Sequence, residues 1–267
     1  MNKDKYILVT GAYGGMGYAA ACVLRDEGYN VIGLDISGCA DSDGIRMIAA
    51  DITSEESVAG ALRAVREITD SLYAILHFAG VYMLDSLVEM GEERIKKIYD
   101  VNLFGVMRVN RIFMPMLSEG SRIVITTSEL APLDPLPFTG IYAITKAALD
   151  KYAYSLRMEL QLLGISVSVL RPGAVDTGMI GKSVEELDKF IETTSLYSCN
   201  AERFKSIVDS VEARRVPVEK IGRLSAKILK AKNPRQVYSI NRNPLLILLG
   251  VLPRRLQTAV IRLILKK

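Results

Sequence analysis

The sequence has few of the residues on which metal and disulfide chemistry depend. Its 267 residues include one histidine, His77, and three scattered cysteines, Cys22, Cys39 and Cys199. A histidine-based metal site or a Ser-His-Asp triad would depend wholly on His77, so we predict neither. The cysteines are odd in number and form no metal-type pair, which argues against a disulfide framework and favours a reducing compartment.

Long apolar runs are also lacking. Residues 1–6 lead into a short apolar segment that has no signal-peptide hydrophobic region. No run reaches the ~20 apolar residues that a membrane-spanning helix needs. We therefore expect a cytoplasmic protein.

Net charge is small and uneven. The chain has 34 Lys and Arg against 30 Asp and Glu, a formal net charge of +4. Residues 245–267 hold five basic residues and no acid, so the rest of the chain is close to neutral. This distribution does not indicate a nucleic-acid-binding protein, and we expect no nucleic acid partner.

Short β-rich runs alternate with helical patterns and predict an α/β fold with a parallel sheet and helices on both faces. The runs are apolar without alternation, as strands buried on both faces should be. Strands are expected at residues 6–10, 30–35, 45–50, 73–78, 122–127, 166–171 and 236–240. Helices are expected at about 15–27, 55–69, 91–117, 140–163 and 217–231.

Residues 178–215 interrupt this alternation. They are charged and helical in pattern, and they lie between a strand end and the next helix. An insertion at the carboxyl ends of parallel strands lies where a substrate lid would be. No linker divides the chain, so we predict one domain over residues 1–267.

A glycine-rich turn follows the first predicted strand and opens a helix near Gly15. Glycines permit a tight turn and the close approach of phosphate oxygens, and the helix amino terminus offers free N–H groups. A plain β–α turn is the alternative, but the position after the first strand favours a dinucleotide site. The cofactor contacts predicted here are Gly11, Tyr13, Gly14, Gly15, Met16 and Gly17.

Two acidic residues end the second and third predicted strands. Asp35 lies where a carboxylate accepts hydrogen bonds from the adenosine ribose and repels a 2′-phosphate. No Lys or Arg occupies residues 36–37 or 11–17, so NAD(H) is favoured over NADP(H), unless Asp35 only starts a turn. Asp51 either bonds the adenine amino group or caps the helix that begins near Ser54, and the sequence leaves both open.

Tyr142 and Lys146 form the predicted proton-transfer pair. They are four residues apart in a helical stretch and so share one face. An ordinary tyrosine has a pKa near ~10, and a neighbouring ammonium favours the phenolate. We expect Lys146, together with the positive nicotinamide ring, to lower the pKa of Tyr142. The spacing alone is weak, since an exposed helical pair has the same pattern.

Ser128 and Asn102 complete the candidate site. Ser128 closes the fifth predicted strand, at the edge where ligands bind in open sheets, and is suited to hydrogen-bond the substrate oxygen. Asn102 is suited to hold a water that links Lys146 to solvent. Alternatively, Ser128 is only a turn residue at the strand end, and Asn102 is an interior amide that hydrogen-bonds to the backbone. The order of all these motifs favours hydride transfer between a nicotinamide cofactor and an alcohol or carbonyl.

In this order the motifs resemble those of the short-chain dehydrogenase/reductase family, and the likeness covers nearly the whole chain. It implies a Rossmann-type sheet of about seven strands and a homodimer or homotetramer, with the helices near 91–117 and 140–163 at the interface. It implies an Asn102-Ser128-Tyr142-Lys146 tetrad without metal. The further cofactor contacts it implies are Asp51, Ile52, Ala79, Gly80, Tyr142, Lys146, Pro172, Gly173, Val175 and Thr177.

One motif departs from the family's pattern. The family usually has Asn-Asn-Ala-Gly where this chain has His77-Phe78-Ala79-Gly80, so the amide that steadies the adjoining strand is absent. This puts the local geometry in doubt, but not the chemistry. We expect His77 to be a buried structural residue.

The tail, residues 245–267, is apolar and basic. After Pro253 its apolar residues follow one helical stripe surrounded by basic residues. This pattern fits a helix on an anionic membrane surface, but it more often belongs to a helix packed on the core or on a second subunit, with its basic residues in solvent. The tail resembles those of hydroxysteroid- and retinol-dehydrogenase-like family members, which suggests a lipophilic alcohol or ketone as substrate.

Other functions remain open from sequence alone. They are an NADP(H)-dependent carbonyl reductase, a nucleotide-sugar epimerase or dehydratase, a non-catalytic dinucleotide sensor and a membrane-surface scaffold. An epimerase usually carries a larger carboxyl-terminal substrate domain than 267 residues allow. A sensor has no need of Tyr142.

Overall fold

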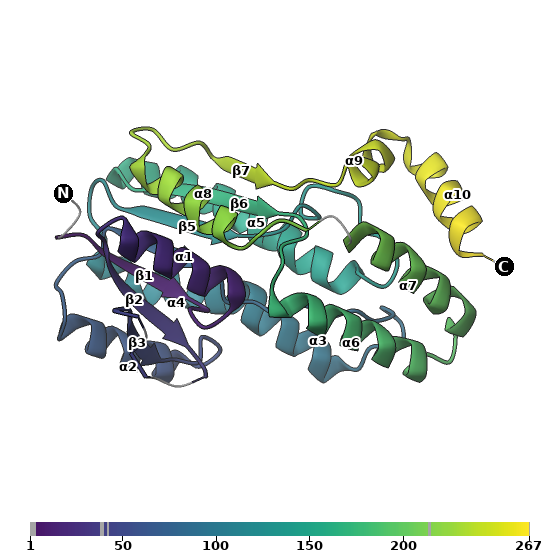
Figure 1. The fold of residues 1–267 in the computed structure, drawn as a ribbon, viewed down its shortest axis with the longest axis horizontal. Helices are drawn as coiled ribbons and strands as arrows, with labels where there is room; N and C mark the ends of the chain where they lie inside the picture. The colour runs from purple at the N-terminus through teal and green to yellow at the C-terminus, as the bar shows by residue number, and fades with distance from the viewer. Residues whose placement is uncertain (1–3, 38–39, 42, 213–214, 267) are drawn as a thin grey trace.

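Seven parallel strands form one sheet in the order β3-β2-β1-β4-β5-β6-β7 (Figure 1). The structure, a computed structural model, describes residues 4–37, 40–41, 43–212 and 215–266. The strands are β1 (Tyr6–Thr10), β2 (Asn30–Asp35), β3 (Arg46–Ala49), β4 (Ala74–His77), β5 (Arg122–Thr126), β6 (Ser166–Pro172) and β7 (Val237–Ile240). Each lies within one residue of its expected bounds, because buried parallel strands appear in the sequence as apolar runs. The Rossmann-type fold class is confirmed.

The strand order reverses between β1 and β4. The chain runs outward from β1 to β3 and then returns to β4, which pairs with the other side of β1. At such a switch point the connections leave in opposite directions, so a crevice opens at the carboxyl ends of the two strands. The expected dinucleotide site lies at this crevice.

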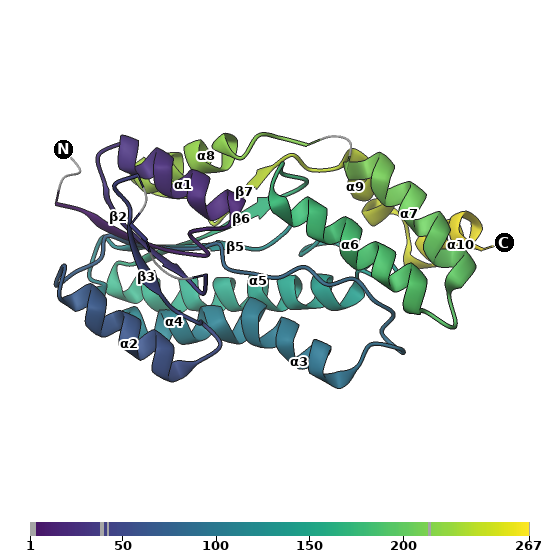
Figure 2. The same cartoon turned by 60° about the horizontal axis from the view of Figure 1, so that its bottom comes forward.

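Helices cover both faces of the sheet. In Figure 2, α1 (Gly15–Asp26) and α8 (Glu219–Lys230) lie on one face, while α2 (Glu55–Arg66), α4 (Val106–Phe113) and α5 (Gly140–Leu160) lie on the other. Each layer has its own apolar core against the strands. These two cores hold the strand ends, and therefore the site, in fixed positions.

The single helix expected at 91–117 is divided. It consists of α3 (Glu92–Tyr99), a π-helical turn η1 (Asp100–Gly105), α4 and a 3₁₀ turn η2 (Met114–Met116). A further 3₁₀ turn, η3 (Gln161–Leu163), follows α5. The expectation of one regular helix was wrong because a π turn adds one residue without disturbing the apolar spacing on either side.

The segment expected as an insertion forms two helices, α6 (Gly178–Thr193) and α7 (Ser198–Glu212), beyond the carboxyl ends of the strands (Figures 1 and 2). Residues 213–214, also part of the predicted segment, lie outside the described part of the chain, and the side chains described in these helices are those of 185–193 and 198–208. Their apolar side chains share one cluster with Leu84, Phe138 and Leu265.

The tail forms α9 (Pro244–Val251) and α10 (Arg254–Leu265) beside these helices. Leu265 is buried in the cluster of α6 and α7, and Gln257 is buried with its amide donating to the carbonyl of Leu252 at 2.9 Å. One face of α10 therefore packs on the rest of the chain, as the core interpretation predicted. Among the described residues, no helix is both long enough and apolar enough to cross a membrane.

A partly buried ion pair joins α5 to β6. Arg171 donates to both carboxylate oxygens of Asp150, at 2.9 and 2.6 Å, and each side chain is about four-fifths buried. We expect Arg171→Met to lower the free energy of unfolding by about 2 kcal/mol, because it leaves a carboxylate unpaired. Urea denaturation measures this loss.

The matched control is Arg111→Met, which breaks the exposed pair of Arg111 with Glu55. An exposed pair contributes about 0–1 kcal/mol. Equal losses in the two variants would contradict the assignment.

Candidate active site

The turn between β1 and α1 has no room for a side chain at Gly11, and neither has the start of α1 at Gly17. Gly11 has a φ of +68°, and a Cβ on it would lie 2.6 Å from the backbone nitrogen of Ala79. A Cβ on Gly17 would lie 2.1 Å from the carbonyl oxygen of Gly11. The helix begins at Gly15 without a side-chain cap, so its first N–H groups are available to an anion. The turn therefore has the geometry that a pyrophosphate cradle requires.

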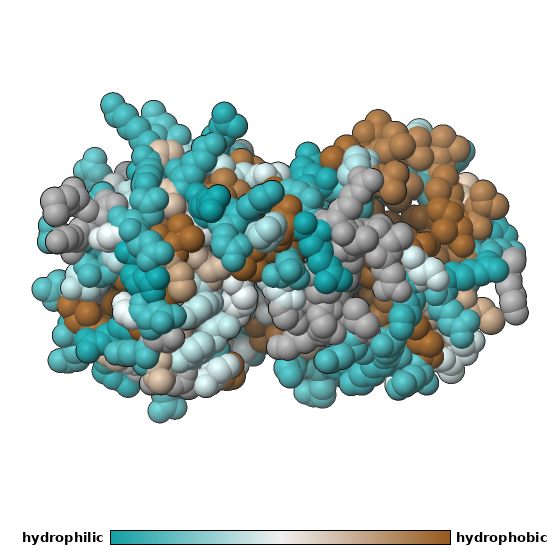
Figure 3. Space-filling view, in the orientation of Figure 1, coloured by the Kyte–Doolittle hydropathy of each residue, from teal (hydrophilic) through white to brown (hydrophobic). Residues whose placement is uncertain are grey.

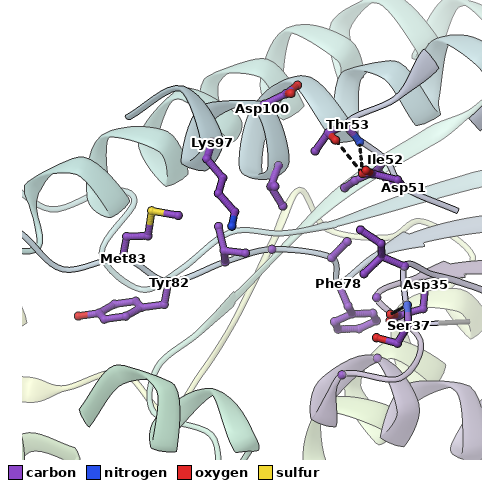
Figure 4. Close-up of a pocket in the computed structure, with 18 of the residues that line it drawn as sticks. Asp35, Ser37, Asp51, Ile52, Thr53, Phe78, Tyr82, Met83, Lys97 and Asp100 are labelled. Carbon is purple, nitrogen blue, oxygen red and sulfur yellow. Dashed lines mark hydrogen bonds between the residues drawn. The ribbon is translucent and has the colours of Figure 1, made fainter. Parts of the chain in front are cut away.

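The turn opens into a cavity of about 1370 Å³ along the carboxyl ends of the central strands (Figure 4). The predicted cofactor residues that line it are Gly11, Tyr13, Gly14, Gly15, Met16, Gly17, Asp35, Asp51, Ile52, Ala79, Gly80 and Thr177. Its size suits a dinucleotide, since pockets for drug-sized ligands are about 300–1,000 Å³.

Five predicted cofactor residues are absent from the lining of this cavity, namely Tyr142 and Lys146 of the tetrad and Pro172, Gly173 and Val175. Pro172 ends β6, and Gly173 packs so closely that a Cβ on it would lie 2.0 Å from the carbonyl oxygen of Asn241. Val175 is buried in the core and pairs with Val216 through a parallel bridge. Their contacts with a cofactor remain predictions.

Asp35 ends β2 beside the glycine turn. Its two carboxylate oxygens accept backbone N–H groups, from Tyr13 at 3.0 Å and from Ser37 at 3.0 Å. A carboxylate offers about four acceptor positions, so it retains capacity for ribose hydroxyls. These two hydrogen bonds orient the Asp35 carboxylate at the cavity wall, as Figure 4 shows.

Asp51 is not the cap of α2. Ser54 holds that position and its hydroxyl accepts the N–H of Ser57, at 3.2 Å. One oxygen of Asp51 accepts instead from the backbone and hydroxyl of Thr53, at 2.9 and 2.7 Å. The capping alternative is therefore wrong, and Asp51 lines the cavity in a local turn (Figure 4).

The cavity approaches the predicted tetrad at Gly80. A Cβ on this glycine would lie 3.3 Å from Oδ1 of Asn102 and 3.5 Å from Nζ of Lys146. Beyond it, the ring of Tyr82 lies 4.8 Å from the ring of Tyr142, centroid to centroid. The tetrad thus borders the end of the cavity that is remote from Asp35.

Asn102 lies in the π turn and is fully buried. Its Oδ1 accepts the N–H of Val81 at 2.8 Å, and its Nδ2 donates to the Val81 carbonyl at 2.9 Å and to the hydroxyl of Thr145 at 3.2 Å. The amide therefore connects the segment that follows β4, at Val81, with helix α5, at Thr145. Both donor hydrogens are used, while Oδ1 has a second acceptor position, so a water held by this amide remains a prediction.

Ser128, Tyr142 and Lys146 converge at the carboxyl end of β5. The Ser128 hydroxyl lies close enough to the Tyr142 phenol to favour the phenolate and oppose the rise in its pKa. The Lys146 ammonium donates to the carbonyl of Thr126 at 3.3 Å and lies 5.7 Å from the centroid of the Tyr142 ring. Strand β5 and the first turns of α5 thus place a hydroxyl, a phenol and an ammonium on one small surface.

Burial is the main cause of the pKa shifts of Tyr142 and Lys146. It raises the pKa of Tyr142 to about 12, although the nearby Ser128 hydroxyl acts in the opposite direction. It lowers the pKa of Lys146 to about 8. The expected lowering of the tyrosine pKa is thus not produced by the protein's own groups, because desolvation of the phenolate outweighs the opposing effect of Ser128.

Sequence reasoning missed several residues that line the cavity. Phe78 lies near Asp35 and Ser37 in Figure 4, while Tyr82 and Met83 lie at the opposite end. Lys97 extends into the cavity from α3. Phe78, Tyr82 and Met83 adjoin the Ala79-Gly80 pair, and that proximity was the only signal in the sequence.

Two acidic side chains fasten the α6–α7 segment over this end of the sheet. Glu186 of α6 pairs with Arg94 of α3 at 2.6 Å. Glu89 accepts the Thr194 hydroxyl at 2.6 Å and backbone N–H groups of Ser195 and Leu196, at 2.9 and 3.1 Å, and the first of these bonds contributes most to holding its pKa down to about 2. The segment is therefore fixed by polar contacts at its border and by an apolar cluster beneath.

His77 lies on the other side of β4 and is buried, as predicted. Its Nε2 lies 2.8 Å from Oδ1 of Asn110, whose Nδ2 donates to the Tyr152 hydroxyl at 3.1 Å. Burial lowers the pKa of His77 to about 4, against the opposing effect of Asn110. This histidine links β4 to α4 and α5 and takes no part in the cavity.

The ionisation of His77 predicts a pH-dependent stability. The unfolded chain binds a proton near pH ~6.5 and the folded chain only near pH 4, so stability is complete at neutral pH and falls as the pH drops between these values. Between pH ~7.5 and ~5 we expect His77 to account for a loss of about 2 kcal/mol. Urea denaturation of the wild type and of His77→Gln at both pH values isolates this share; the same pH dependence in both proteins would refute it.

Comparisons with known proteins agree with this geometry. The family model described as short chain dehydrogenase matches residues 5–188. NADPH-dependent 1-acyldihydroxyacetone phosphate reductase of Schizosaccharomyces pombe is 29% identical over 74% of this chain and 69% of its own. The 3-ketodihydrosphingosine reductase of Bacteroides thetaiotaomicron is 26% identical over 87% and 86%.

A solved structure shows the same fold. The 3-ketoacyl-(acyl-carrier-protein) reductase of Brucella melitensis, complexed with NADH, superposes with a TM-score of 0.74, covering 91% of this chain and 99% of its own at 20% identity. The chain therefore belongs to the short-chain dehydrogenase/reductase family, whose members are oxidoreductases that act on alcohol and keto groups with a nicotinamide dinucleotide.

Proposed function

We propose that this chain transfers a hydride between NAD(H) and a lipophilic secondary alcohol or ketone. The observation that carries the proposal is the meeting of Ser128, Tyr142 and Lys146 beside a cavity whose far end presents Asp35. When bound, the nicotinamide supplies or accepts the hydride. The chain's own residues bind and orient both partners and move the proton.

Tyr142 is the proposed acid and base. A pKa of about 12 keeps the phenol protonated at neutral pH, which suits donation of a proton to a ketone oxygen. Oxidation of an alcohol needs the reverse transfer, and therefore a lower pKa. Lys146 is close enough to favour the phenolate once the positive nicotinamide ring adds to its effect.

Ser128 and Asn102 support this transfer in different ways. The Ser128 hydroxyl adjoins the phenol and hydrogen-bonds the same substrate oxygen, which holds that oxygen in line with Tyr142. Asn102 supports the relay as a positioning residue, because it fixes Val81 on the cavity wall and Thr145 on α5. Lys146 also lies where it can bind the nicotinamide ribose.

The preference for NAD(H) rests on Asp35. Its carboxylate faces the adenosine side of the cavity, and no basic residue lies at 36–37 or within the glycine turn. A 2′-phosphate would meet this negative charge. The alternative is an NADP(H)-dependent carbonyl reductase, and the name of the Schizosaccharomyces pombe relative favours that cofactor.

A lipophilic substrate has independent support. The names of two relatives specify keto compounds with lipid character. The segment α6–α7, which we propose is a substrate lid, packs through Phe190 and other apolar side chains on Phe138 in a buried apolar cluster. A steroid- or retinoid-like alcohol fits the same description, so a test panel should include steroids and long-chain secondary alcohols.

We also propose a homodimer or homotetramer in the cytoplasm. Family members typically oligomerise. Phe104 and Met107, on η1 and α4, and Tyr154 and Met158, on α5, are large apolar side chains exposed on the helices expected at the interface. Exposed apolar side chains on adjacent helices are typical of a subunit contact.

Replacing the phenol tests the assignment of the acid and base. We expect Tyr142→Phe to keep the fold and NADH affinity but to lower kcat about 10³-fold, because proton transfer loses its donor. Turnover of the alcohol panel and fluorescence titration with NADH measure the two properties. Turnover at the wild-type rate would remove Tyr142 from its role, and NADH binding without turnover in the wild type would favour a sensor.

The cofactor preference is tested by titrating the protein with NADH and NADPH side by side. We expect NADH to bind more tightly, and Asp35→Asn to weaken NADH about tenfold while it strengthens NADPH, because the charge that favours one and repels the other is lost. Asp70→Asn, an exposed control outside the cavity, should change neither affinity. Tighter binding of NADPH by the wild type would overturn the preference.

A further inference from the structure

Helices α9 and α10 present an apolar face to solvent. Figure 3 shows hydrophobic side chains gathered over both helices on the side turned to the viewer. Leu245, Leu248 and Val251 recur every third residue on one face of α9 and are 64–76% exposed. A contiguous patch of this kind is unusual on a monomer and marks an interaction surface.

A basic row borders the apolar stripe of α10. Leu256 and Leu263 lie seven residues apart and are both exposed, and Arg255 and Arg262 lie one position before each of them. Arg255, Arg262 and Leu263 line one shallow groove on this helix with Lys266. Within the described residues, no ion pair engages Arg255 or Arg262, so their charges are available to a partner.

The opposite side of the helix pair is fixed to the protein. Leu265 and Gln257 are buried, and Asn200 of α7 donates to the carbonyl of Leu265 at 2.7 Å. Arg254 pairs with Asp134 at 3.0 Å. These contacts hold the apolar and basic rows outward without any change in conformation.

The surface adjoins the substrate side of the site. Asn243, the residue that caps α9, donates its N–H to Glu129 at 2.6 Å, and Glu129 directly follows Ser128. Burial raises the pKa of Glu129, and the bond from Asn243 acts against it. A Cβ on Gly250 would lie 3.2 Å from Leu133, on the loop after β5. The tail is thus tied to the loop that carries the catalytic serine.

We propose that this surface docks on an anionic phospholipid bilayer. Leucine and valine side chains would enter the acyl boundary, while Arg255, Arg262 and Lys266 would pair with lipid phosphates. The helices are too short to span a bilayer and lie suitably in its plane. A second copy of the chain is a poorer partner, because residues 245–267 carry five basic residues and no acid, and a two-fold contact would bring like charges together.

Docking goes beyond the proposed reaction and does not depend on it. It would place the loop after Ser128 beside the lipid phase, where a lipophilic alcohol or ketone is concentrated. Its test therefore measures binding to vesicles and not turnover. NADH affinity is measured separately as a check on the proposed function, because the cofactor cavity lies along the central strands and away from α9 and α10.

The test is flotation of the full chain with vesicles of phosphatidylcholine alone and of phosphatidylcholine mixed with phosphatidylglycerol. We expect binding to the mixed vesicles that weakens with salt. The double variant Arg255→Gln/Arg262→Gln should lower the partition coefficient about 25-fold, since each basic residue near an anionic surface contributes about fivefold. Leu248→Asn/Leu263→Asn should abolish binding.

Matched controls remove the same groups elsewhere. Arg66→Gln/Arg223→Gln removes two exposed arginines on α2 and α8, and Leu162→Asn removes a leucine as exposed as Leu263. Both should bind vesicles as the wild type does, and all variants should keep their NADH affinity.

Three outcomes would overturn docking. The first is that the wild type does not bind the mixed vesicles. The second is that the control variants lose as much vesicle binding as the tail variants. The third is that Leu248→Asn/Leu263→Asn converts an oligomer to monomers in analytical ultracentrifugation. If the wild type did not bind NADH, that result would instead contradict the proposed function.

Discussion

The site depends on the burial of an ammonium and a phenol side by side. Lys146 is 6% exposed, and its contacts are a backbone carbonyl and the Tyr142 ring. Burial moves the two pKa values in opposite directions, to about 12 for Tyr142 and about 8 for Lys146, so at neutral pH the phenol is protonated and the lysine remains mostly an ammonium. Such a pair responds strongly to one added positive charge. The oxidised nicotinamide ring is that charge in the reaction we propose, and the chemistry would then be coupled to cofactor binding.

The rest of the structure holds this pair against a cofactor cavity. Gly80 brings the backbone within reach of Lys146, and the Asn102 amide fixes the adjoining Val81. The π turn places that amide in the interior, where a regular helix would rotate it by one position. At the far end, Gly11 and Gly17 keep the turn clear of side chains. The cavity thus has the glycine turn, the proposed phosphate cradle, at one end and Tyr142, the proposed proton donor, at the other.

The positions of the strands and of most site residues could be predicted from the sequence, but the pKa of Tyr142 could not. Strand positions, the cradle and Asp35 were predictable because apolar runs, glycines and strand-end acids have few structural solutions. The π turn was not, since it leaves the apolar spacing on either side intact, and the bonds of Asn102 depend on it. The role of Asp51 needed the observation that Ser54 caps α2. The pKa of Tyr142 in the protein alone was not predictable, because helical spacing shows that Lys146 is near but not how deeply the phenol is buried.

The central claim is that Tyr142 is protonated in the protein alone and gains acidity only when a positive nicotinamide ring joins Lys146. Ultraviolet difference titration of wild type against Tyr142→Phe, with and without NAD⁺, measures this pKa directly. The account predicts a pKa near 12 without NAD⁺ and a fall of about three units with it. The same pKa under both conditions would contradict the account.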